Sequence, residues 1–143
     1  FEITETAAIS NFVEAQTFID ELKAQGCHFA LDDFGSGVSS FGYLKNMPVD
    51  FLKIDGSFVK EIAKNPIDRA MVDAMNRIGH DLHLKTVAEY VEDAEILKQL
   101  SDLNVDFAQG YHLAKPMPIG DLLQYYADSL FTKPGTKDSL SAS

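Results

Sequence analysis

The sequence is poor in cysteine, in basic side chains and in long apolar runs. Its single cysteine, Cys27, excludes a disulfide framework and a zinc site built from cysteines. No apolar run approaches the roughly 20 residues that span a bilayer, and no signal-like segment opens the chain. We therefore expect a cytoplasmic location and no membrane segment, with any membrane attachment of a parent protein lying in domains outside this chain.

The charge balance narrows the choice of partners. The 12 lysines and arginines face 22 acidic residues, which gives a net charge of −10. This excludes nonspecific binding to a DNA or RNA polymer, because such binding needs a basic face that collects phosphates. An acidic protein can still process a phosphate ester when divalent cations lie between its carboxylates and the substrate.

What remains is an ordinary globular composition, with 45% hydrophobic and 24% charged residues in 143, about the length of one domain. The chain lacks an initiator Met, and residues 1–5 already alternate apolar and polar side chains like a strand. We therefore expect a fragment whose N-terminal part is absent. Residues 1–131 are predicted to form the folded part, and residues 132–143, rich in Ser, Thr, Gly and Pro, a flexible tail.

Strand-like and helix-like segments alternate along the folded part. Apolar spacing predicts helices over residues 9–25, 66–82, 94–103 and 119–130, and a short helix that ends near Asn46. The helix after Asn65 is predicted to bury a stripe formed by Ile67, Met71, Ala74, Ile78 and Leu82. Strand ends near residues 5, 32, 55, 89 and 109 predict an α/β fold with a parallel sheet. Five βα units amount to the C-terminal part of a (β/α)₈ TIM-like barrel.

Acidic residues gather at the ends of these strands. The set comprises Glu2, Glu5, Asp32, Asp33, Asp55, Glu89 and Glu92, and Gln109 closes the fifth strand. A single acid at a strand end simply marks the emergence of the chain into solvent, but acids on four strands would meet at one rim, where barrel active sites lie. Clustered carboxylates need a positive partner, and an all-oxygen ligand set favours Mg²⁺ or Mn²⁺. The adjacent Asp32 and Asp33 suit a pair of ions about 3.5–4 Å apart.

Lys53 precedes Asp55 by two residues, so both side chains are expected on the same side of their strand. Two interpretations remain open. Lys53 forms a structural ion pair with Asp55, or it stabilises charge that develops on a phosphate and positions the attacking water.

Several motifs in register resemble the C-terminal portion of EAL domains, the bacterial phosphodiesterases specific for cyclic di-GMP. The similarity covers about residues 1–118. The matching stretches are Phe1-Glu2-Ile3-Thr4-Glu5, Leu31-Asp32-Asp33-Phe34-Gly35-Ser36-Gly37, Leu52-Lys53-Ile54-Asp55, Val87-Ala88-Glu89-Tyr90-Val91-Glu92, Gln109-Gly110-Tyr111 and Lys115-Pro116.

The resemblance implies metal-dependent hydrolysis of cyclic di-GMP to linear pGpG with two Mg²⁺ or Mn²⁺ ions. It implies the following roles: Glu2, Asp32 and Asp33 as metal ligands, Glu89 as general base or metal ligand, Lys53 as a contact to the water or phosphate, and Gln109, Asp55 and Glu92 as supporting or substrate-binding groups. It also implies that Glu5 braces the loop from Phe34 to Ser40, which includes Gly35, Ser36 and Gly37. That loop and the helix after it would form a homodimer contact.

The chain departs from the family pattern at two positions and in extent. Tyr90 stands where the family has Gly, so a bulky ring is expected to reshape the guanine side of the pocket, and Val38 replaces a usual aromatic. The Glu-Ala-Leu signature and a metal-binding Asn are not in this chain, so we expect an incomplete catalytic domain that is inactive in isolation. The alternative function is a receptor that binds cyclic di-GMP without hydrolysing it.

Overall fold

The computed structural model describes residues 1–37 and 41–131. Val38 and the end of the predicted loop to Ser40 lie outside the described residues, as does the predicted tail, residues 132–143. Within the described ranges, no helix combines the length and the apolar character that crossing a membrane requires.

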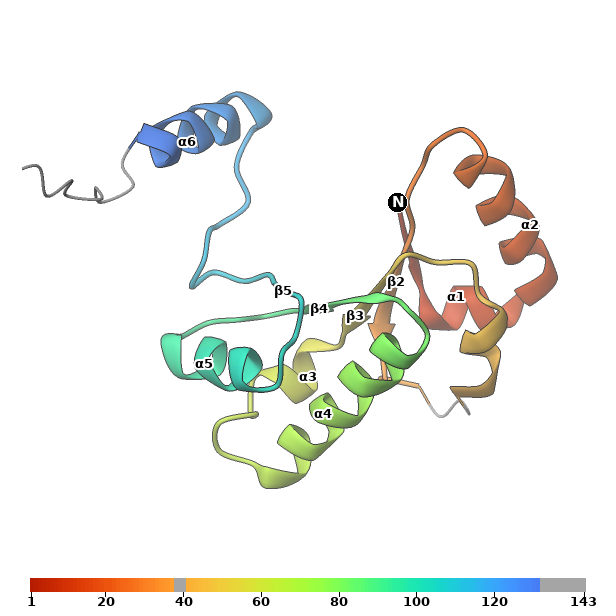
Figure 1. Ribbon diagram of the computed structural model, residues 1–143, viewed down its shortest axis with the longest axis horizontal. Helices are drawn as coiled ribbons and strands as arrows, with labels where there is room; N and C mark the ends of the chain where they lie inside the picture. The colour runs from red at the N-terminus through yellow and green to blue at the C-terminus, as the bar shows by residue number, and fades with distance from the viewer. Residues whose placement is uncertain (38–40, 132–143) are drawn as a thin grey trace, which may run out of the picture.

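The described strands form one five-stranded sheet in the order β1-β2-β3-β4-β5 (Figure 1). Their bounds are Glu2–Thr4, Ala30–Phe34, Phe51–Ile54, Lys85–Ala88 and Phe107–Ala108. Every neighbouring pair is parallel, with Leu31 opposite Leu52 and Leu52 opposite Thr86. The predicted α/β fold is confirmed, and the sheet is that of a partial barrel of five βα units. All strands therefore end at the same edge of the sheet.

Most helices connect the strands and lie against the sheet, whereas the last described helix lies apart from it (Figure 1). Their bounds are α1 Glu5–Ser10, α2 Phe12–Lys23, the 3₁₀ helix η1 Phe41–Asn46, α3 Gly56–Val59, α4 Pro66–Asp81, α5 Ala94–Asp102 and α6 Ile119–Phe131. Asn65 and Asp93 cap α4 and α5 through side-chain oxygens that accept hydrogen bonds from Ile67 N and Ile96 N. The core between helices and sheet includes the fully buried Leu31, Leu52, Ile54, Val72 and Ala88.

The helix predicted over residues 9–25 corresponds to α2, but a separate helix, α1, precedes it, and the two helices meet at Asn11. The first of them begins at Glu5, which sequence reasoning had assigned to the first strand. Thr4 explains the early start, because its hydroxyl accepts a hydrogen bond from Ala7 N at 3.3 Å and caps the helix. Because the helix begins at Glu5, this residue belongs to α1 and not to β1.

The predicted buried stripe of α4 was right only toward its C-terminal end, where Ile78 and Leu82 pack against the core. Ile67 and Met71 are exposed, whereas Val72, Met75, Asn76 and Gly79 are buried. The reason lies at Gly79, where an added Cβ would come within 2.7 Å of Thr86 Cγ2. Because α4 approaches β4 this closely, only the face that carries glycine fits against the sheet. The spacing of large apolar residues could not reveal that choice.

Candidate active site

A buried lysine lies at the centre of the carboxylates that the strand ends bring together. Lys53 Nζ, on β3, is 2.9 Å from Glu2 Oε1, 2.9 Å from Asp32 Oδ1 and 2.9 Å from Glu89 Oε1. These partners come from β1, β2 and the end of β4, and the Lys53 side chain is only 6% exposed. Burial acts to lower the pKa of Lys53, but the three carboxylates outweigh it and raise that pKa above its ordinary value. The lysine therefore stays charged.

Three acidic side chains beside this lysine could hold a metal ion. One carboxylate oxygen from each of Asp32, Asp33 and Glu89 lies within 4.8 Å of the others. Consecutive strand residues normally face opposite sides of a sheet. Asp33 breaks that alternation with a φ of 56°, and the register between β2 and β3 shifts between Leu31 and Phe34. The irregularity brings both aspartates to the same cluster.

The cluster is short of positive charge despite Lys53. Burial raises the pKa of Asp33, and the neighbouring carboxylates of Asp32 and Asp55 raise it further. Burial also raises the pKa of Glu89, against the opposing effect of Lys53. Asp32 Oδ1 is shut off from solvent, and its contact among the described residues is the 2.9 Å ion pair with Lys53 Nζ. An oxygen in this state and two carboxyls with raised pKa values fit a cation ligand set.

One interpretation of the sequence paired Lys53 with Asp55, but Asp55 has a different role. Its Oδ1 accepts a hydrogen bond from Ser57 N at 2.8 Å and caps α3. The ion pairs of Lys53 run instead to the neighbouring strands. Asp55 acts on the cluster through its charge, which raises the pKa of Asp33.

Glu5 links the cluster to the segment that follows β2. It is 2% exposed, and its two oxygens accept hydrogen bonds from Gly35 N at 3.1 Å and from Tyr43 Oη at 2.8 Å. Gly35 has a φ of 96°, and an added Cβ there would meet Met75 Sδ at 2.8 Å, so the position requires glycine. Glu5 thereby ties the turn after Asp33 to η1.

The rest of that turn is local. Ser36 Oγ donates a hydrogen bond to Asp33 O at 2.8 Å, and Ser36 N donates to the same oxygen at 3.2 Å. Gly37 is exposed and is the last described residue before the gap. These bonds hold the backbone of Asp33 in its left-handed conformation.

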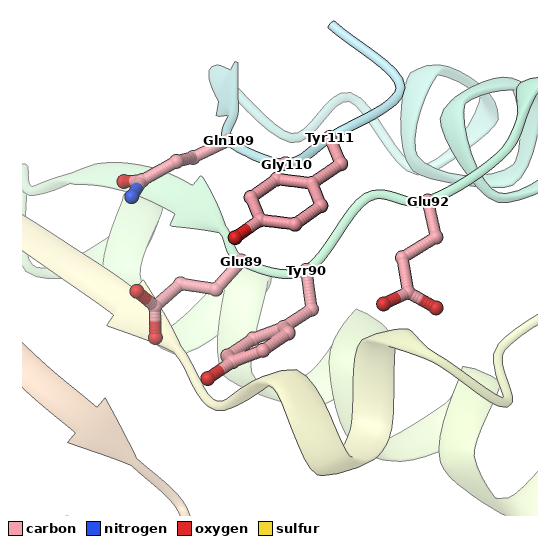
Figure 2. A pocket seen from close by; sticks show the side chains of 6 residues that line it. All are labelled: Glu89, Tyr90, Glu92, Gln109, Gly110 and Tyr111. Atoms are coloured by element: carbon pink, nitrogen blue, oxygen red, sulfur yellow. The ribbon is translucent and has the colours of Figure 1, made fainter. Parts of the chain in front are cut away.

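A hollow of about 290 Å³ adjoins the carboxylates on the side of β4 and β5 (Figure 2). It is lined by Glu89, Tyr90, Glu92, Gln109, Gly110 and Tyr111. The backbone of Gln109 is fixed on both sides, since its N donates to Ala88 O at 2.8 Å and its O accepts from Val91 N at 3.0 Å. The exposed Glu92 lines this hollow and is not among the described carboxylates that pair with Lys53, so it stands apart from the central cluster.

Sequence analysis expected the ring of Tyr90 at the pocket, and Tyr90 lines the hollow, but it missed Tyr111 as a lining residue. A tyrosine that follows a strand carries no signal of its own, because aromatic side chains at such positions commonly pack in the core. The only available sign for Tyr111 was its proximity to Gln109 in the chain.

Comparison with known proteins identifies the group to which this site belongs. A sequence model described as the EAL domain matches residues 1–116. The chain belongs to the EAL domain family. Among curated EAL-containing relatives, "Cyclic di-GMP phosphodiesterase PdeB" of Shewanella oneidensis is 42% identical over 130 residues, which cover 91% of this chain and 15% of PdeB.

Solved EAL structures give the same result. The PaMucR phosphodiesterase in complex with c-di-GMP superposes with a TM-score of 0.79 at 39% identity, over 85% of this chain and 49% of that chain. A manganese/cy-diGMP complex of Klebsiella pneumoniae BlrP1 superposes with a TM-score of 0.71 at 32% identity, over 77% of this chain and 28% of that one. This EAL chain therefore spans about half the length of the first of these structures and about a seventh of PdeB.

Proposed function

We propose that this EAL chain supplies part of the active site of a phosphodiesterase that hydrolyses cyclic di-GMP to linear pGpG. The observation that carries the proposal is the convergence of Asp32, Asp33 and Glu89 within 4.8 Å at the strand ends. The activity in the name of PdeB and the c-di-GMP in the PaMucR complex support the choice of substrate.

The proposed cofactor is a pair of Mg²⁺ or Mn²⁺ ions. Asp32, Asp33 and Glu2 would be the ligands from this chain, since all offer carboxylate oxygens, which hard divalent ions prefer. The solvent-shielded Oδ1 of Asp32, whose contact among the described residues is the ion pair with Lys53, fits this role, and the manganese in the BlrP1 complex supports it. Such ions, when bound, neutralise phosphate charge and lower the pKa of a bound water.

The side chains of this chain divide the remaining work. Glu89 acts as the general base, because burial raises its pKa toward the range in which a carboxylate accepts a proton from water. Hydrolysis adds the water oxygen to phosphorus and breaks the bond to the leaving sugar oxygen, which takes up a proton. Lys53 remains charged beside Glu89 and stabilises negative charge on the phosphate. Gln109, Asp55 and Glu92 are the supporting polar groups at the rim.

Product analysis tests the proposal in the full-length protein. Cyclic di-GMP and Mg²⁺ or Mn²⁺ are expected to yield pGpG in a chromatographic assay. Glu89→Ala should abolish turnover and spare most binding, whereas Asp32→Ala should reduce metal binding and turnover together. Glu14→Ala, which changes an exposed acid on α2, is the matched control and should leave both unchanged. Turnover unaffected by Glu89→Ala would contradict the role of the base.

A non-hydrolysing receptor is the alternative function. Tight binding of cyclic di-GMP without any pGpG at saturating Mg²⁺ and Mn²⁺ would favour it. The five charged groups around the proposed site, Glu2, Asp32, Asp33, Lys53 and Glu89, are what hydrolysis needs and what a receptor does not, so they favour the enzyme.

We also propose a homodimer contact through the turn after Asp33 and η1. Phe41 supports it, since 39% of this residue is exposed at the start of η1 while its ring packs 5.1 Å from that of Phe34. Sedimentation analysis tests it: Phe41→Asp should shift the full-length protein from dimer to monomer. A dimer that persists in this variant would refute the contact.

A further inference from the structure

Two tyrosines flank the proposed catalytic glutamate. Tyr90 and Tyr111 both line the hollow that contains Glu89 (Figure 2). In Figure 2 the ring of Tyr90 and the carboxylate of Glu89 lie below the ribbon of the segment that carries them, and the ring of Tyr111 lies above that ribbon. The hollow, at about 290 Å³, has the order of size of a small-ligand site. Glu89 is the reacting group in the proposed function, so these rings border the reaction centre.

Tyr90 occupies this place at the expense of backbone strain. Its φ is 55°, in the left-handed region that an aromatic residue seldom adopts. Strain of this kind persists only where surrounding contacts determine the conformation, and it concentrates at functional sites. The neighbours on both sides are tied down, because Glu89 N donates to Ile54 O at 3.4 Å and Val91 N donates to Gln109 O at 3.0 Å.

Two contacts with α3 position the ring. An added Cβ on Gly56 would lie 2.1 Å from Tyr90 Cδ2, so only glycine leaves room for the ring there. Lys60, which caps the C-terminus of α3, places its Nζ 4.1 Å from the centroid of the same ring. With both contacts in place, 54% of Tyr90 is still exposed. A fixed ring with this much open surface has area left for a ligand beside the face that Lys60 covers.

Tyr111 is held against the same segment by its backbone. An added Cβ on Gly110 would lie 2.2 Å from Val91 O, so the backbone segments that carry Gly110 and Val91 are in direct contact. His112 N donates a hydrogen bond to Val91 O at 3.0 Å. The spacing between the two tyrosines is thus set by backbone contacts rather than by flexible side chains.

We propose that Tyr90 forms an aromatic subsite that stacks on a planar purine base and holds the phosphate of the same nucleotide next to Glu89. The inference rests on the proposed function, because cyclic di-GMP carries two guanine bases, each on a ribose that is joined to the phosphodiester groups, one of which is hydrolysed. Tyr90 is therefore a specificity-determining residue, and Glu89 remains the group that performs the chemistry. Stacking suits this position because every base presents a π-face to an exposed ring.

The test compares ring, volume and position in the full-length protein. The variants are Tyr90→Phe, which keeps the ring, Tyr90→Leu, which removes it, and Tyr125→Leu, the same change at a residue of α6 that is 53% exposed. Calorimetry measures the affinity for two probes, cyclic di-GMP and guanosine 5′-monophosphate, with Ca²⁺ in place of Mg²⁺ to suppress turnover. Thermal unfolding of each variant is measured without ligand.

Tyr90→Leu is expected to weaken the binding of both probes about tenfold, which is the order of effect of losing one base–aromatic stack. Tyr90→Phe and Tyr125→Leu should bind within about twofold of wild type. A merely structural role for Tyr90 predicts instead a lower unfolding temperature in Tyr90→Leu together with unchanged affinity at a temperature where the variant is folded, and this result would overturn the inference.

The two probes separate the failure of the subsite from the failure of the proposed function. Cyclic di-GMP turnover with equal binding by wild type and Tyr90→Leu would refute the subsite and leave the proposed function standing. Absence of cyclic di-GMP turnover, with Tyr90-dependent binding of guanosine 5′-monophosphate, would refute the proposed hydrolysis and keep the subsite. Failure of both probes to bind would overturn both.

Discussion

Replacement of Lys53 by methionine tests whether this lysine is the internal counter-ion of the carboxylate cluster. The change keeps most of the aliphatic stem and removes the charge. Glu2, Asp32 and Glu89 remain in place, and each loses the ion pair of 2.9 Å that it makes with Lys53 Nζ. Like charges in a shielded site repel one another, so the folded state should become less stable.

The exposures of the partners set the size of the effect. The Glu2 side chain is 57% exposed, so solvent screens this pair and its loss should change the stability by less than about 1 kcal/mol. The side chains of Asp32 and Glu89 are 20% and 12% exposed, and breaking a buried pair typically costs about 3–5 kcal/mol. We therefore expect Lys53→Met to lower the free energy of unfolding by about 3 kcal/mol near pH 8, the lower end of that range.

The pH dependence has a definite sign. Without Lys53, the pKa values of Glu89 and Asp33, already raised in the folded state, rise further. A carboxyl with a raised folded pKa stabilises the protein below its unfolded pKa, and that stabilisation is lost as the pH rises through the folded pKa. The destabilisation by Lys53→Met should accordingly be largest at high pH and shrink as the pH falls toward the ordinary values of 3.8 and 4.5.

Urea unfolding of the full-length protein between pH 4.5 and 8 measures this difference. Addition of Mn²⁺ should restore more stability to Lys53→Met than to wild type, because an ion that binds only the folded state stabilises it. Lys64→Met, at an exposed lysine, is the control and should change stability by less than about 0.5 kcal/mol. A loss below 1 kcal/mol in Lys53→Met that does not vary with pH would refute the counter-ion argument.

Two further variants test contacts away from the lysine. Glu5→Gln should lower the free energy of unfolding by about 1–3 kcal/mol, since both buried oxygens of Glu5 accept hydrogen bonds and an amide places a donor against one of them. Urea unfolding, with Tyr43→Phe measured alongside, gives the size of this loss, and an unchanged unfolding midpoint would contradict it. Asp106→Asn removes the partner of Lys85 and His80, whose hydrogen bonds hold the pKa of Asp106 well below its usual range. A depressed folded pKa stabilises above the unfolded value of 3.8, so the variant should lose about 1–3 kcal/mol at pH 7 and approach wild type as the pH falls below that value; a loss that stays constant down to pH 2 would oppose this.

Much of the architecture follows from local patterns in the sequence. The order of strands and helices could be predicted because each strand is short, apolar and followed by a capped helix, as at Asn65 and Asp93. The convergence of acids on one edge then follows from the parallel order alone. What could not be predicted is the face of α4 that meets the sheet, because a close approach at Gly79 decides it.

At the centre of the site, too, some features could be predicted from the sequence and others could not. The position of Lys53 two residues before Asp55 suggested a charged group directed to the rim, but not which acids it would pair with. The acids that pair with Lys53 depend on the register of the neighbouring strands. The sequence does not reveal which residues of β1, β2 and β4 lie level with Lys53. The irregular register of β2, which brings Asp32 and Asp33 together, is equally a property of the assembled sheet.

Because Lys53 both neutralises the cluster and adjoins Glu89, loss of activity on its replacement cannot by itself assign it a part in the chemistry. A variant that no longer gathers Asp32 and Glu89 would be inactive for structural reasons alone. The two effects separate under conditions where added Mn²⁺ restores the stability of Lys53→Met to that of wild type. Turnover that returns together with stability makes Lys53 a counter-ion only, whereas turnover that stays low in a fully stable protein requires its charge in the transition state.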